Sequence, residues 1–287
     1  MPATAGSRAS CGRKTSAEHV IKLLALLGVA YAGVTSLLYF AQDWLLFPGA
    51  GLPSRPIDQP RAPERLALPS GDGAALAGML LRAPDAGADL LIGFGGNAQD
   101  AEVLAQELAK DFPDLHVAVF HYRGFGPSTG RPSEAALLAD ALTIHDTLTG
   151  RLRPQRTYAI GISLGSAVAA WLSQQRRLAG VLLITPFDSI EAIAKENYFW
   201  VPVGLLLRHR FATSEFMAGN STPVAVIAAE ADQVVRPART RALVERLPNL
   251  VFHRVLAGAS HNTLYQLPAY AEALKEAFAT LRAAART

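Results

Sequence analysis

A serine between two glycines, in the run Gly161-Ile162-Ser163-Leu164-Gly165, is the residue of this sequence best placed to do chemistry. The apolar stretch before it is typical of a buried strand, and the small-residue stretch after it is typical of a helix. A sharp turn between the two exposes the serine hydroxyl at the amino end of the helix, where the helix field favours developing negative charge. Larger side chains at the glycine positions would clash with the strand and the helix. The pattern therefore predicts that Ser163 is a nucleophile.

A serine hydroxyl is a poor nucleophile without a base within hydrogen-bond reach and an acid that orients the base. Three histidines follow the serine in the chain. His209 lies in a candidate insertion, His253 lies inside a predicted strand, and His261 lies in a loop just past the last predicted strand. Only the loop placement lets an imidazole reach the serine turn, so we predict His261 as the base. A solvated histidine on a surface loop is the alternative.

The acid is expected at the carboxyl end of a strand between the serine and the histidine, because that is the chain order for this kind of turn. Asp232 follows the apolar run 224–229 and meets this expectation, so we predict it as the acid. Glu230 lies nearer the strand end. Asp188 follows an earlier strand, and it suits a residue that caps or orients a neighbouring insertion, or a solvated turn residue.

Attack by the serine creates an oxyanion, which needs two backbone N–H donors. One is expected from Leu164, the residue after the nucleophile, and the other from the glycine-rich loop 93–98 (GFGGNA), where we predict the N–H of Asn97. A simple tight turn would use the same glycines. The sequence has no H-E-x-x-H spacing, and the loop lacks the full G-x-G-x-x-G pattern, so we predict neither a metal nor a cofactor.

Apolar runs bounded by turn residues alternate with longer, helix-like segments through most of the chain. Strands are predicted over 75–82, 89–94, 116–121, 157–161, 179–185, 223–229 and 250–256. Helices are predicted over 98–111, 133–148, 164–176, 236–246 and 265–284. The later strands are almost continuously apolar, as strands buried on both faces must be. The alternation predicts an α/β fold with a mostly parallel central sheet and helices on both faces.

The segment 187–222 breaks this alternation, because it is long, aromatic and apolar and falls between two predicted strands. We predict that it is an insertion whose stretch 198–207 (YFWVPVGLLL) forms a small helical lid over the site. A lid that serves only packing would show the same composition.

The run 23–41 (LLALLGVAYAGVTSLLYFA) carries no charge and is close to the length that crosses a bilayer as a helix. Basic residues precede it, and Asp43 follows it. The positive-inside rule then predicts a cytoplasmic tail over 1–22 and a catalytic domain on the far side of the membrane. The Pro- and Gly-rich stretch within 42–62 is predicted as a linker, and 63–287 as the catalytic domain.

Two other interpretations of the run 23–41 stay open. It suits a cleaved signal peptide, with Ala30-Tyr31-Ala32 as a small-residue cleavage site, or a buried helix of the folded domain. The apolar run continues well past Ala32, which favours an uncleaved anchor.

Length and composition bound the class of protein. The 287 residues suffice for one large α/β domain. The net charge of +3 is spread along the chain without a basic stripe, so a nucleic-acid partner is not expected. The single cysteine, Cys11, excludes an intrachain disulfide. Abundant Ala and Arg are typical of a GC-rich bacterial source, which would put the catalytic domain on the periplasmic side of the inner membrane.

With these residues in view, the chain resembles the membrane-anchored α/β-hydrolase-domain proteins, which include the Bem46-like proteins. The resemblance rests on the serine turn and on the stretches 42–48 (QDWLLFP), 122–134 (YRGFGPSTGRPSE), 185–189 (TPFDS), 231–235 (ADQVV) and 258–261 (GASH). It implies an α/β-hydrolase fold and a triad of Ser163, Asp232 and His261. It also implies acyl ester or thioester substrates, because relatives are similar to lysophospholipid lipases, monoacylglycerol lipases and protein depalmitoylases.

The chain departs from the family pattern at the oxyanion loop. Relatives usually have His-Gly-Asn there, and this chain has Gly95-Gly96-Asn97. The resemblance implies that the family histidine braces the loop, and this chain lacks that support. The hole itself depends on backbone N–H groups, which the change leaves in place.

Our first hypothesis is a serine hydrolase that cleaves acyl esters or thioesters of a small-molecule, lipid or long-chain acyl substrate through an acyl-enzyme. A serine peptidase or amidase that uses the same triad is the alternative. A non-catalytic, membrane-tethered binding module is the third hypothesis, and the intact serine, acid and histidine argue against it.

Overall fold

A computed structural model describes residues 11–49 and 62–286 of the chain. The chain divides into two compact units, Met1–Gln42 and Asp43–Thr287. Residues 50–61, most of the predicted linker, lie outside the described residues, as do the first ten residues of the predicted cytoplasmic tail. The predicted boundaries of the tail, anchor and linker therefore stay predictions.

The helix α1 (Cys11–Leu46) contains the predicted anchor and is longer at both ends. Its part Ala17–Leu46 is long and apolar enough to cross a membrane, with a mean hydropathy of 1.9 in its most apolar window. Only 6% of that window is buried, which is unlike the core helix of a soluble domain. The hydroxyl of Thr35 donates to the carbonyl oxygen of Tyr31 (2.9 Å), so this polar group is satisfied within the helix.

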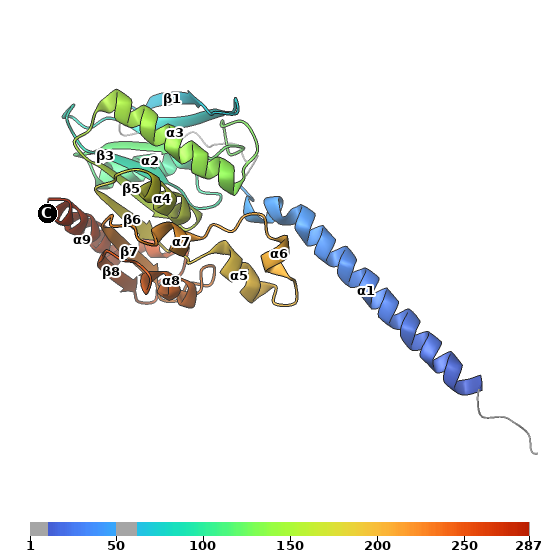
Figure 1. The fold of residues 1–287 in the computed structure, drawn as a ribbon. Helices are drawn as coiled ribbons and strands as arrows, with labels where there is room; N and C mark the ends of the chain where they lie inside the picture. Colours follow the sequence, from blue (N-terminus) through green and yellow to red (C-terminus); the bar gives the residue numbers. More distant parts are fainter. Residues whose placement is uncertain (1–10, 50–61, 287) are drawn as a thin grey trace, which may run out of the picture. The chain divides into compact units, whose positions relative to one another are not determined.

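The second unit is built on one sheet of eight strands (Figure 1). The strands are β1 (Glu64–Pro69), β2 (Ala75–Leu81), β3 (Leu90–Phe94), β4 (His116–Phe120), β5 (Thr157–Ile162), β6 (Gly180–Ile184), β7 (Val224–Ala229) and β8 (Leu250–Leu256). Their order in the sheet is β1-β2-β4-β3-β5-β6-β7-β8. The strand β2 runs antiparallel to β1 and β4, and β3 to β8 pair in parallel with their neighbours. The predicted mostly parallel sheet is confirmed.

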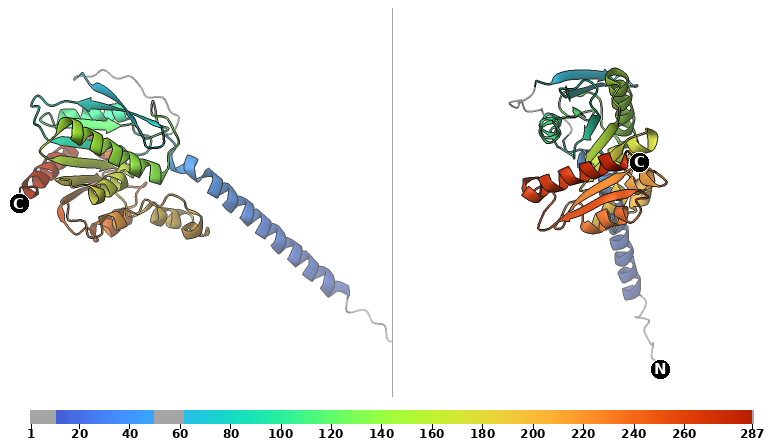
Figure 2. Two further views of the ribbon diagram at one scale, coloured as in Figure 1. Left: turned by 45° about the horizontal axis from the view of Figure 1, so that its top comes forward. Right: turned by 90° about the vertical axis from the view of Figure 1, so that its left-hand side faces the viewer.

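Helices cover both faces of the sheet, so it is enclosed in two apolar cores (Figure 2). One face packs against α3 (Glu134–Leu152), α4 (Leu164–Gln175) and α8 (Pro237–Val244). The other packs against α2 (Ala101–Asp111) and α9 (Pro268–Ala284), which a 3₁₀ turn, η1 (Leu264–Gln266), precedes. Every residue of β3, β4, β5, β6 and β7 is buried, which explains their continuously apolar sequences.

The strand β1 is absent from the sequence prediction. It lies at the edge of the sheet, where its residues alternate between partly buried and exposed positions. A strand with one solvated face carries fewer apolar residues than the buried ones, and this one also holds two charges and a proline.

The segment between β6 and β7 is an insertion of three short helices, α5 (Ile190–Asn197), α6 (Val203–Leu206) and α7 (Thr213–Met217). The helix α7 packs on α4, where the ring of Phe216 meets Trp171 edge to face at 5.2 Å. By contrast, the tip of the insertion is open to solvent, with side chains such as Phe199 (85% exposed) and Leu205 (88% exposed).

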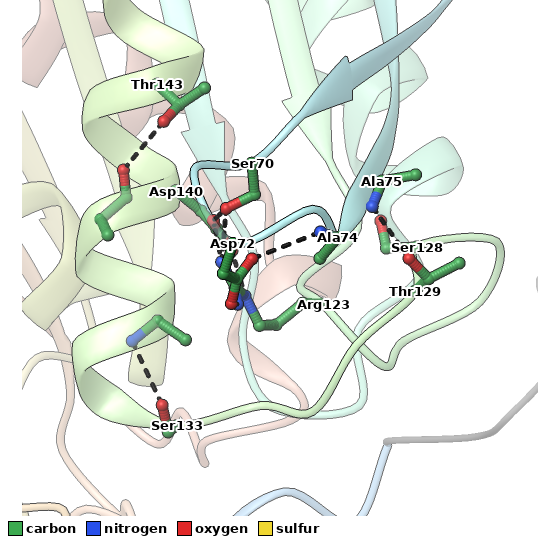
Figure 3. A network of polar contacts seen from close by, with 12 residues as sticks. Ser70, Asp72, Ala74, Ala75, Arg123, Ser128, Thr129, Ser133, Asp140 and Thr143 are labelled. Atoms are coloured by element: carbon green, nitrogen blue, oxygen red, sulfur yellow. Dashed lines mark hydrogen bonds and ion pairs between the residues drawn. The ribbon is translucent and has the colours of Figure 1, made fainter.

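A buried ionic network supports the loop that follows β4 (Figure 3). The guanidinium of Arg123 donates to both carboxylate oxygens of Asp140 on α3, at 2.8 and 2.5 Å. It also donates to the Ser70 hydroxyl (2.7 Å) and to the Asp72 carboxylate (2.5 Å). Arg123 and Asp140 are both almost fully buried, and the hydrogen bond to Asp140 raises the pKa of Arg123. The network thus joins α3, the loop after β4 and the turn between β1 and β2.

Removing one partner of this buried pair is expected to destabilise the domain. Arg123→Ala leaves the Asp140 carboxylate buried without its cation, which costs about 3–5 kcal/mol. Chemical denaturation of the full chain in detergent measures the loss. The matched control is Arg82→Ala, which breaks an exposed pair with Glu64 and should cost less than about 1 kcal/mol. Equal costs for the two variants would contradict a supporting role for the network.

Candidate active site

Ser163 lies directly after β5, at the turn into α4, with φ of 50° and ψ of −114°. This positive φ is unusual for a residue other than glycine and marks a strained backbone. A β-carbon on Gly161 would lie 2.3 Å from the carbonyl oxygen of Gly165. One on Gly165 would lie 2.1 Å from the carbonyl oxygen of Phe94 at the end of β3. Both contacts are impossible for a side chain, so the turn admits only glycine at these two positions.

The structure brings Ser163, His261 and Asp232 into one line of hydrogen bonds. His261 Nε2 lies 3.1 Å from Ser163 Oγ, and Nδ1 lies 2.7 Å from Asp232 Oδ2. The three residues follow β5, β7 and β8, and parallel strands present their carboxyl ends at one edge of a sheet. With its proton on Nδ1, the imidazole donates to the carboxylate and accepts from the serine hydroxyl. The arrangement can therefore remove a proton from Ser163.

The carboxylate of Asp232 is held from two sides. Its Oδ1 accepts the backbone N–H groups of Val234 (2.9 Å) and Val235 (2.7 Å), and its Oδ2 faces the imidazole of His261. The residue is 6% exposed, so water does not compete for these positions. The acid is thereby fixed in the orientation that holds the imidazole ring toward the serine.

The other candidate acids have structural partners elsewhere. Glu230 accepts the backbone N–H of Gly258 (2.8 Å), which ties the end of β7 to the loop that carries His261. Asp188 accepts from the guanidinium of Arg239 (3.0 Å) at the start of the insertion.

Of the other two candidate histidines, His209 accepts the backbone N–H of Glu134 at Nδ1, so its Nε2–H donates to the carboxylate of Asp43 at 2.9 Å. His253 lies within β8, where burial lowers its pKa. Neither is part of the line of hydrogen bonds at the serine.

The glycine-rich loop after β3 lies directly against the serine turn. A β-carbon on Gly96 would lie 3.6 Å from the β-carbon of Ser163. The N–H of Gly96 donates to the side-chain oxygen of Gln99 (2.8 Å), and the carbonyl of Gly95 accepts from the hydroxyl of Tyr122 (2.8 Å). Burial raises the pKa of Tyr122, so this hydroxyl stays a donor. These two bonds brace the loop in a chain that lacks the family histidine.

Two backbone N–H groups at the site, those of Asn97 and Leu164, have no acceptor among the described residues. Leu164 is the first residue of α4, whose opening N–H groups have no partner within the helix. The N–H of Gly96 is already used by Gln99, which leaves Asn97 as the neighbouring donor of the loop. Both N–H groups that the sequence suggests for an oxyanion are therefore available.

Sequence reasoning missed Gln99 and Tyr122 as supports of the loop. Tyr122 is part of the stretch that carries the family resemblance, but the sequence alone does not show what its hydroxyl contacts. Gln99 follows Gly96 by three residues, and at this spacing a side-chain oxygen can accept the backbone N–H that opens a turn.

Comparisons with known proteins agree with this architecture. The sequence model of the family described as alpha/beta hydrolase fold matches residues 90–211. An uncharacterized protein of Mycobacterium tuberculosis is 32% identical over 250 residues, which cover 85% of this chain and 89% of that protein. The lysophosphatidylserine lipase ABHD12 of Danio rerio is 34% identical over 140 residues, 42% of this chain and 36% of the lipase.

Solved structures show the same fold at lower identity. An esterase of Pyrococcus furiosus superposes with a TM-score of 0.61 at 16% identity and covers 79% of this chain and 98% of its own. Est1E of Butyrivibrio proteoclasticus, solved with ferulic acid, has a TM-score of 0.60 at 17% identity, and the match covers 75% of this chain and 99% of Est1E. From the sheet order, the serine turn and these relatives together, the chain belongs to the α/β-hydrolase superfamily.

Proposed function

We propose that this hydrolase cleaves acyl esters or thioesters through Ser163, with His261 as base and Asp232 as the acid that orients it. The observation that carries the proposal is the line of hydrogen bonds from Asp232 through His261 to the serine hydroxyl, at 2.7 and 3.1 Å. A strained serine on a turn that admits only glycine beside it supports the same role.

The reaction follows from these positions. His261 takes the hydroxyl proton as Ser163 Oγ bonds to the carbonyl carbon, and the N–H groups of Asn97 and Leu164 bind the oxyanion. The oxyanion collapses, the bond to the alcohol or thiol breaks, and the leaving group receives the proton from His261. A water molecule then gives a proton to His261 as its oxygen bonds to the acyl carbon. The bond from that carbon to Ser163 Oγ breaks, the acid leaves, and His261 returns the proton to the serine oxygen.

Three features support a lipid or long-chain acyl substrate. The insertion presents apolar side chains at its tip, Phe199 and Leu205 among them. The chain also carries an apolar helix long enough to enter a bilayer, where such substrates reside. The relative that matches 42% of this chain is named a lysophosphatidylserine lipase, and its name describes a lipid substrate.

We also propose the orientation that the charge pattern predicts, with the tail before residue 23 in the cytoplasm and the catalytic domain outside. The basic residues before the apolar run 23–41, which are Arg8, Arg13, Lys14 and Lys22, support it. In a bacterium, the catalytic domain then faces the periplasm.

Loss of the serine hydroxyl should abolish hydrolysis. Ser163→Ala is expected to lower kcat for acyl esters by about 10⁴-fold or more, and to abolish labelling by a fluorophosphonate probe. The control Ser173→Ala removes another serine hydroxyl from α4, where it bonds to the carbonyl of Ala170, and should leave kcat within about twofold. A chromogenic ester panel of rising acyl length, run beside peptide amides, measures the substrate class. Faster turnover of the amides would replace the esterase proposal with peptidase action.

Measurements of kcat should distinguish between the two candidate acids, Asp232 and Asp188. Asp232→Asn is expected to lower kcat by about 10³–10⁴-fold at an almost unchanged KM, because the amide no longer holds the imidazole in its working tautomer. Asp188→Asn loosens only the contact with Arg239 and should change kcat by less than about threefold. Similar kcat losses in both variants would refute the assignment of Asp232.

The single cysteine provides a test of orientation. In spheroplasts of an expressing bacterium, Cys11 should react with a membrane-impermeant maleimide only after the membrane is permeabilised. The control carries Cys11→Ser together with Gly71→Cys, an exposed position of the catalytic domain, and should react without permeabilisation. The opposite pattern of labelling would place the catalytic domain in the cytoplasm.

A further inference from the structure

The last turn of α1 and the residues after it, 43–49, which we call the juxtamembrane segment, pack on the catalytic domain. They include most of the stretch QDWLLFP, to which the proposed chemistry assigns no role. The carboxylate of Asp43 contacts Arg208 (2.8 Å) and His209 (2.9 Å) at the base of the insertion. The ring of Phe47 is 1% exposed and meets Phe211 edge to face. The segment is thus held in place over the domain.

From this position the segment reaches the oxyanion loop. The side-chain amide of Asn97 donates a hydrogen bond to the carbonyl oxygen of Leu46, the last residue of α1. Carbonyl groups in the last turn of a helix have no partner within the helix, so Leu46 has an acceptor free for this bond. The same residue, Asn97, carries a backbone N–H that has no acceptor among the described residues, and it directly follows Gly96, which lies against the serine turn.

A second contact lies next to the first. A β-carbon on Gly49 would lie 2.7 Å from the α-carbon of Ala98 and 2.5 Å from the ring of Phe125. Ala98 itself has a φ of 63°, a left-handed backbone that alanine adopts at a cost. The backbone of the segment therefore presses directly on the backbone that follows Asn97, without room for a methyl group.

We propose that the juxtamembrane segment is a positioning part of the active site. Leu46 and Gly49 hold the residues 97–98 so that the N–H of Asn97 points to the oxyanion. The inference rests on the proposed function. It gives the stretch QDWLLFP a role in the reaction, in addition to joining the apolar helix to the catalytic domain. Loss of an oxyanion donor lowers the rate by about 10²–10³-fold, and displacement of a catalytic group by about 1 Å lowers it by about 10²-fold. Small shifts of this segment are therefore expected to lower kcat.

Gly49→Ala in the full chain, purified in detergent, tests the contact. Its methyl group forces Ala98 or Phe125 to move, and we expect kcat per active site to fall about 10–100-fold, with KM changed less than about threefold. Titration with a fluorophosphonate counts the active sites. The matched control Gly71→Ala places its methyl group in open space and should leave kcat unchanged.

An alkyl boronate supplies the readout that separates positioning from folding. It forms a tetrahedral adduct on Ser163 whose oxygen occupies the oxyanion site, so its affinity should fall in Gly49→Ala by about the same factor as kcat/KM. If Gly49→Ala lowers only the number of titratable sites, and kcat per site and boronate affinity stay at the wild-type values, the proposal is overturned.

The hydrogen bond to Leu46 is tested separately. Asn97→Asp keeps the shape of the side chain, removes the donor and turns a carboxylate toward the Leu46 carbonyl, so kcat and boronate affinity should fall together by at least about tenfold. Wild-type values in this variant would overturn the proposal. Wild-type turnover in Ser163→Ala would instead refute the proposed function, so the two failures are distinguishable.

Discussion

The close approach between the start of α4 and the ends of β3 and β5 is the constraint on which the rest of the site depends. At this crossing the backbone of Gly165 lies against the carbonyl oxygens of Phe94, the last residue of β3, and Gly95, and no side chain fits. Ser163 is held there in a backbone conformation that costs on the order of 1–3 kcal/mol. The buried helix residues 167–170, packed on the central strands, offset that strain. Ser163, the proposed nucleophile, is therefore positioned by a fully buried part of the domain.

Much of this arrangement could be predicted from the sequence because burial leaves a clear pattern. Strands buried on both faces are continuously apolar, and β3 to β7 are predicted for that reason. The edge strand β1 was not predicted, because one of its faces is solvated and its sequence is therefore not continuously apolar. The observed ends of some helices differ from the predicted ones, because capping residues and turns set these ends. The helix α2 begins at Ala101 because the side chain of Asp100 caps it, and α9 begins at Pro268 because a 3₁₀ turn precedes it.

The supports of the site could not be predicted in the same way. The order serine, acid and histidine restricts Ser163, Asp232 and His261 to loops after three strands, so a pattern along the chain suffices to select them. The bonds from Tyr122 to Gly95 and from Asn97 to Leu46 join residues far apart in sequence, and neither changes the periodicity of its own segment. The absence of the family histidine from the loop 95–97 is visible in the sequence, whereas the tertiary contacts of this loop with Tyr122 and Leu46 leave no pattern there.

The insertion shows how the domain combines a fixed base with an exposed tip. At its base, the carboxylate of Glu134 on α3 accepts the backbone N–H groups of Arg210 (2.6 Å) and Phe211 (2.8 Å), and Phe211 is fully buried. Burial is the main effect on Glu134 and raises its pKa. The tip around Phe199 is exposed by comparison and has few packing contacts that resist movement. The contacts of Asp43 and Glu134 therefore fix the base of the insertion, whereas its apolar tip is open to solvent.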